Sequence, residues 1–147
     1  MESIKTEDFK TLNILVYALM AGMTLFTCVV LFLVTGDQGI GDGPIFGEIQ
    51  DLGFVALFAV VCVTMSRVLY QKLLDNLPRE DRQDYNKAFS VYRSANILRY
   101  ALLEGPGLMA CVFALLTGNL QLLLVTAFLL AVMWMVRPSA EQFADWR

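Results

Sequence analysis

Four long runs of apolar residues constrain this chain more than any other feature of its sequence. They cover residues 11–34, 52–70, 97–117 and 120–136, and the first contains no charged side chain. A helix needs roughly 20 largely apolar residues to cross the hydrocarbon core of a bilayer. No run alternates apolar and polar residues as a barrel strand does, and the backbone in lipid must satisfy its own hydrogen bonds. The sequence therefore predicts an all-α membrane protein with four transmembrane helices in one bundle.

Composition supports this fold class and excludes several functions. The chain has 147 residues, of which 57% are hydrophobic and 17% charged, whereas a soluble domain has about a quarter charged residues. The absence of histidine excludes imidazole-ligated haem, most zinc and copper sites, and a histidine general base. The net charge of −3 gives no sign of nucleic-acid binding. We expect a single domain over residues 1–147, with no cofactor, no metal and no enzymatic activity.

The basic residues predict the orientation in the membrane. All eleven Lys and Arg residues lie in the N-terminal tail, in the segment between spans two and three and its flanks, or after span four. By the positive-inside rule this side is cytoplasmic, so both termini should lie in the cytoplasm of a multi-pass cell (inner) membrane protein. The connection between spans one and two holds four acidic residues, Asp37, Asp42, Glu48 and Asp51. It suits a solvated outer loop better than a divalent-cation site, since it lacks the EF-hand spacing.

The segment 67–96 between spans two and three carries helical spacing of its own. Leu69, Leu73 and Leu77 form one stripe before Pro78, and Tyr85, Phe89 and Tyr92 form another after it. This pattern predicts an antiparallel helical hairpin that extends spans two and three into the cytoplasm, with the second arm beginning near Arg79. The two stripes either pack on each other or offer a docking surface to a cytoplasmic partner.

Three spans carry a line of small and polar residues at helical spacing. Membrane helices pack through such residues, so we expect the three lines to meet inside the bundle and span four to have the most lipid contact. The lines are Asn13, Tyr17, Ala21, Thr24 and Cys28; Ala56, Ala59, Val63, Ser66 and Tyr70; and Asn96, Tyr100, Glu104, Gly107, Cys111, Ala114 and Gly118. The cysteines, which include Cys62, lack paired spacing and are expected to be small apolar fillers.

Glu104 is the most unusual residue of these lines because it places a carboxylate inside an apolar run. Its expected ion-pair partner is Arg67, with Arg99 second, and Tyr100 and Tyr17 are expected hydrogen-bond donors. The Gly105-Pro106-Gly107 sequence predicts a helix kink with a polar pocket beside it. Such a carboxylate either links helices structurally or acts as a proton relay, ion site or counter-charge.

The segment R-Y-A-L-L-E-G-P at 99–106, with R-P-S at 137–139 and four spans, resembles small uncharacterised bacterial four-span integral membrane proteins. This resemblance covers most of the chain and implies the fold without an activity. The expected function is a non-enzymatic scaffold or accessory subunit with a membrane-protein partner, or a homo-oligomer. The alternative is a proton- or ion-coupled transport component centred on Glu104.

Overall fold

The computed structural model describes residues 6–37 and 49–146, and the regular structure in these ranges is entirely helical. Asp42 and Glu48 of the acidic loop therefore lie outside the described residues. The helices are α1 (Thr6–Asp37), α2 (Ile49–Asp75), the 3-10 helix η1 (Asp81–Gln83), α3 (Tyr85–Thr117), α4 (Leu122–Met135) and α5 (Ala140–Trp146). The all-α prediction is confirmed for this part of the chain.

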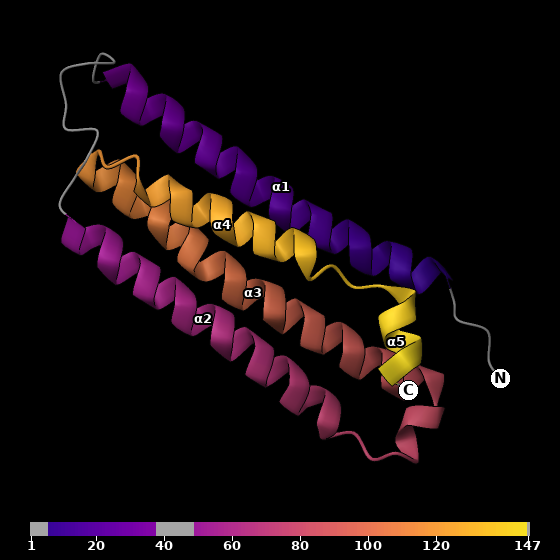
Figure 1. Ribbon diagram of the computed structural model, residues 1–147. Helices are drawn as coiled ribbons and strands as arrows, with labels where there is room; N and C mark the ends of the chain where they lie inside the picture. Colours follow the sequence, from indigo (N-terminus) through magenta and orange to yellow (C-terminus); the bar gives the residue numbers. More distant parts are fainter. Residues whose placement is uncertain (1–5, 38–48, 147) are drawn as a thin grey trace.

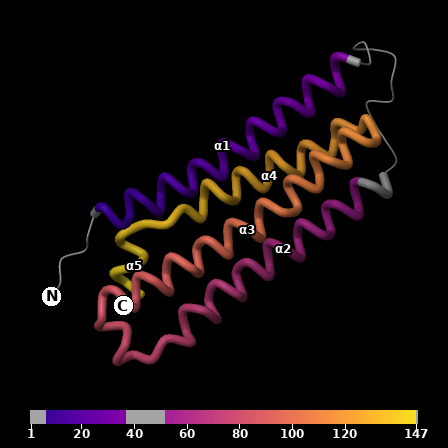
Figure 2. The backbone as a smooth tube through the Cα atoms, turned by 180° about the vertical axis from the view of Figure 1, so that it is seen from behind, coloured from indigo at the N-terminus to yellow at the C-terminus, as the bar shows by residue number. Residues whose placement is uncertain are grey.

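The four long helices lie side by side, and the chain reverses direction between successive helices (Figure 1). Helix α3 packs against α1, α2 and α4 and is therefore the central helix of the bundle. The start of α1, the end of α2, the start of α3 and the short helix α5 gather at one end of the bundle, as the tube also shows from behind (Figure 2). The predicted antiparallel arrangement of α2 and α3 is present.

Three of the helices, α1, α2 and α3, are long and apolar enough to cross a membrane. A fourth crossing exists only if α4 and α5 count as one span, and these two are bent by 64°. The 14 residues of α4 extend about 21 Å, which is shorter than the roughly 30 Å hydrocarbon core. Helix α4 ends within one residue of its predicted apolar run, and Pro138, which disfavours helical geometry at the residue before it, follows.

Helix α3 begins at Tyr85, six residues later than the predicted start near Arg79. The side chain of Asp84 accepts hydrogen bonds from the backbone N–H groups of Asn86 and Lys87, at 3.0 and 3.4 Å. This is the bonding of a helix N-cap, and it fixes the first turn of α3. The acidic residues after Pro78 belong to the connection instead, where Asp81 in η1 forms an ion pair of 2.7 Å with Lys87.

The stripe at the start of α3 is covered by both ends of the chain. Phe143 of α5 is completely buried, and its ring centroid lies 5.1 Å from that of Tyr92 and 5.6 Å from that of Phe9 in α1. It also contacts the rings of Tyr85 and Phe89, each at 5.9 Å. We call Phe9, Tyr85, Phe89, Tyr92 and Phe143 the aromatic cluster. The stripe therefore packs on α1 and α5 as well as on the arm of α2, and it does not offer its aromatic rings as a free docking surface.

Two hydrogen bonds fix the chain ends to this cluster. The Tyr85 hydroxyl donates to the carboxylate of Asp8 at 3.1 Å, and the Tyr92 hydroxyl donates to the carbonyl of Ser139 at 3.3 Å. Each buried ring thus places its polar tip on an oxygen atom of a terminal segment, which suits an aromatic residue with one apolar and one polar end. The first turns of α1 and the start of α5 are held against α3 in this way.

The small and polar face of α3 is largely buried, that of α2 is buried only at Ala59 and Ser66, and that of α1 is mostly exposed. Tyr17, Ala21, Thr24 and Cys28 are exposed, and the buried side chains of α1 are large. The reason is complementary packing, because the small residues of α3 receive the large side chains of α1. Only 17% of the most apolar window of α1 is buried, against 39% in α3, so α1 exposes more of its apolar surface than α3 does. The buried large residues of α1 are Phe9, Leu12, Val16, Met23, Val30 and Val34.

We predict that Phe143→Ala releases α5 from the bundle. Truncating a fully buried phenylalanine costs about 3–5 kcal/mol, which is more than a helix of seven residues can offset alone. Hydrogen–deuterium exchange in detergent should show the amides of 140–146 losing their protection. Phe128→Ala, at a ring that is 57% exposed on α4, is the matched control and should leave α5 protected. Unchanged protection of α5 in Phe143→Ala would contradict the role of the aromatic cluster.

Candidate functional site

Glu104 lies at the margin of the buried face of α3. Its side chain is half-buried, and it makes no hydrogen bond or ion pair with any residue that the structure describes. Tyr100 and Gly107, one turn before and after it, are buried. Glu104 therefore lies close to the interior of the bundle, but no described residue of the bundle bonds its carboxylate.

The ion pair expected between Glu104 and Arg67 is absent, and so is the second choice with Arg99. The guanidinium of Arg99 lies over the ring of Tyr70 in α2, 4.8 Å from its centroid. Five residues separate Arg99 from Glu104, which turns the two side chains roughly 140° apart around the helix. Arg67 is exposed on α2 and makes no ion pair with a residue that the structure describes.

The expected hydrogen-bond donors near Glu104 bind backbone carbonyls instead. The hydroxyl of Tyr100 donates to the carbonyl of Met133, near the end of α4, at 2.9 Å in a buried position. The amide of Asn96 donates to the carbonyl of Tyr92 within α3, also at 2.9 Å. Both side chains are buried on the face of α3 where the sequence places them. They stabilise the packing of α3 and leave no donor for the carboxylate.

Tyr17 contributes to a different arrangement, between α1 and the end of α4. Its hydroxyl accepts a hydrogen bond of 2.8 Å from Arg137, whose guanidinium lies 5.6 Å from the ring centroid of Trp134. The rings of Tyr17 and Trp134 are 6.3 Å apart. The predicted hydrogen bond from Tyr17 to Glu104 is therefore not formed. Exposed aromatic rings with a nearby arginine are typical of residues at a membrane–water interface.

The Gly105-Pro106-Gly107 segment does not interrupt α3, which continues as one helix from Tyr85 to Thr117 (Figure 1). The carbonyl of Gly107 accepts a hydrogen bond of 3.1 Å from the hydroxyl of Thr126 in α4. This hydroxyl also lies 3.5 Å from the sulfur of Cys111, which is 3.5 Å from the hydroxyl of Thr27 in α1. We call Thr27, Cys111, Thr126 and the Gly107 carbonyl the polar chain. It joins three helices through their interior.

Sequence reasoning missed the polar chain because its members come from three different runs. Thr126 is fully buried and contacts two other members of the polar chain. In the sequence, however, it is a single polar residue within an apolar segment. A lone hydroxyl in a membrane helix is a signal in itself, since it either bonds its own backbone or a neighbouring helix. Cys111, expected to be only a small filler, is a polar contact between two threonines.

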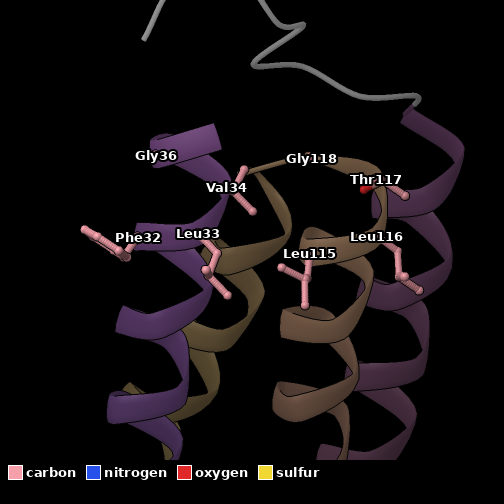
Figure 3. A pocket seen from close by; sticks show the side chains of 8 residues that line it. All are labelled: Phe32, Leu33, Val34, Gly36, Leu115, Leu116, Thr117 and Gly118. Atoms are coloured by element: carbon pink, nitrogen blue, oxygen red, sulfur yellow. The ribbon is translucent and has the colours of Figure 1, made fainter. Parts of the chain in front are cut away.

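A pocket of about 690 Å³ lies at the opposite end of the bundle, far along α3 from the start of the helix. The side chains of Leu33 in α1 and Leu115 in α3 project into the space between the two helices, as Figure 3 shows. None of the side chains that line the pocket is charged, and Thr117 is the one lining residue with a polar side chain. The remaining lining residues are Phe32, Val34, Gly36, Leu116, Thr117 and Gly118.

No known protein family, no curated protein and no solved structure matches this chain. Its function must therefore be argued from its own residues. The polar residues that sequence reasoning grouped around Glu104 are divided among three places. Asn96 and Tyr100 lie in the core, Arg99 lies against Tyr70 of α2, on which Arg67 is exposed, and Tyr17 lies against the end of α4.

We predict that Gly107→Ala destabilises the bundle while Gly105→Ala does not. A Cβ atom on Gly107 would lie 2.6 Å from the sulfur of Met23, whose side chain is completely buried and cannot move without disturbing its neighbours. Overpacking of this kind costs about 1–3 kcal/mol. A Cβ atom on Gly105 meets nothing within 4 Å, and alanine has the higher helix propensity.

Unfolding of the two variants in detergent by denaturant titration measures this difference. Met23→Ala should cost less stability in the Gly107→Ala background than in the wild type, because there it also removes the clashing sulfur. Equal stability of the two alanine variants would show that α1 and α3 do not approach each other as described.

Proposed function

We propose that this protein is a small, non-enzymatic accessory subunit that associates with another membrane protein through the surface of α3 around Glu104. The observation that carries the proposal is a half-buried carboxylate in an apolar helix without a partner among the described residues of its own chain. A helix of another protein that carries a hydrogen-bond donor at the same depth in the membrane would supply the missing partner of this carboxylate.

The free energy of an unpaired carboxylate in lipid favours such an association. An acidic side chain at the centre of a membrane helix costs about 2.5–3.5 kcal/mol on insertion scales, and less near the interface. A hydrogen bond from a partner offsets part of this cost only in the complex. The surface of α3 beside Glu104 also favours the association. Ala101 and Gly105 are exposed there, and such small residues let a second helix approach closely.

A transport role for Glu104 has less support from its surroundings. A proton or ion pathway needs further polar groups within reach, and Asn96, Tyr100 and Thr126 bind backbone carbonyls instead. The space beside Gly107 is filled by Met23. These contacts favour a packed subunit over one with a polar passage. Cytoplasmic termini in a cell inner membrane stay part of the proposal, on the charge distribution given above.

Co-purification in a mild detergent tests the proposal. We expect Glu104→Leu to lower recovery of the partner at least about tenfold, which corresponds to about 1.4 kcal/mol, and Glu104→Gln to keep part of it. The matched control is Glu141→Gln, which neutralises an exposed carboxylate of α5 and should leave recovery unchanged. The size of the purified complex distinguishes a different membrane protein from a second copy of this chain.

Two results would contradict the accessory role. The first is equal recovery of all co-purifying proteins from the wild type and Glu104→Leu. The second is a pH-dependent ion flux in proteoliposomes that contain this protein alone, if Glu104→Gln abolishes it. That result would establish the transport alternative.

A further inference from the structure

Arg67 and Arg99 form a pair of cations between α2 and α3. Arg67 is exposed on α2, one turn before Tyr70, and the half-buried Arg99 of α3 places its guanidinium 4.8 Å from the centroid of the Tyr70 ring. Stacking on Tyr70 orients the guanidinium of Arg99. We call Arg67, Tyr70 and Arg99 the arginine pair site.

No carboxylate of the described chain neutralises this pair. Neither Arg67 nor Arg99 makes an ion pair with a residue that the structure describes. The Nε–H group of Arg99 is buried and has no hydrogen-bond partner. Two like charges beside a buried, unpaired donor raise the free energy of the protein unless an anion binds there.

The position of the pair indicates which anion is available. Tyr100, the residue after Arg99, donates to the carbonyl of Met133, the residue before Trp134, so the pair lies at about the level of Tyr17, Trp134 and Arg137. Aromatic rings and arginines gather at the level of lipid headgroups. Phosphate groups are the most abundant anions at that level, and a guanidinium binds a phosphate through two parallel hydrogen bonds.

We propose that the arginine pair site binds the phosphate headgroup of an anionic phospholipid. Arg99, oriented by Tyr70, donates from its guanidinium to the phosphate oxygens, and the exposed Arg67 supplies the second positive charge. Basic sites between membrane helices are known to take such headgroups. Arg137 does not share this role, because it already donates to Tyr17 and lies over Trp134.

The experiment measures lipid binding by native mass spectrometry of the purified full chain. The probes are phosphatidylglycerol, phosphatidylcholine as the zwitterionic comparison, and inorganic phosphate as the lipid-free source of the same group. We expect phosphatidylglycerol to bind at least about tenfold more tightly than phosphatidylcholine. The double variant Arg67→Gln/Arg99→Gln should abolish this preference. Arg93→Gln, which removes one exposed cation from the same helix, is the matched control and should keep the preference.

Three results would contradict the proposal. Equal binding of the two lipids by the wild type would show that the pair recruits no anionic headgroup, and this comparison needs no variant to fold. A preference that survives in the double variant would place the lipid elsewhere. Inorganic phosphate that binds as tightly as phosphatidylglycerol would assign the site to a soluble anion.

Discussion

The hydrogen bonds that join α3 to α4 are the interactions on which the rest of the bundle depends. Tyr100 donates to the carbonyl of Met133, and Thr126 donates to the carbonyl of Gly107. In an apolar environment an unsatisfied polar group costs several kcal/mol, so each pair of groups strongly favours the geometry that brings it together. These two bonds lie about two turns apart on α3 and fix its rotation relative to α4. The faces that α3 presents to α1 and α2 follow from that rotation.

The same hydrogen bonds explain why the carboxylate of Glu104 has no partner in the interior. Asn96, Tyr100 and Thr126 are bonded to carbonyls, so none of these three donors is left for Glu104. Arg99 turns towards Tyr70 of α2, so it does not pair with the carboxylate either. The carboxylate of Glu104 and the guanidinium groups of Arg67 and Arg99 are therefore left without an ion-pair partner among the described residues. Both proposals concern these charges, one through a protein partner and the other through a lipid.

The sequence predicted the helical fold and the buried face of α3, because apolar length and small-residue spacing are local properties. The sequence did not predict which face of α1 is buried. Small residues face inward on only one helix of a contacting pair, and the other helix places large side chains against them. Gly107 supplies the space and Met23 fills it. The contacts of Phe143 and Thr126 depend on residues more than fifteen positions away, and no local pattern indicates such partners. The pairing of Arg67 with Glu104 failed for the same reason, because which side of a helix a charge faces depends on its neighbours.

The central claim is that the surface around Glu104 contacts protein rather than lipid in the native membrane. Photo-crosslinking from a photoreactive residue at Ala101, which is exposed three positions before Glu104, tests it most directly. The account predicts a crosslinked protein band that is lost in Glu104→Leu, whereas the same probe at Phe128 on α4 should give none. Crosslinks from Ala101 to lipid alone, unchanged by Glu104→Leu, would contradict the account.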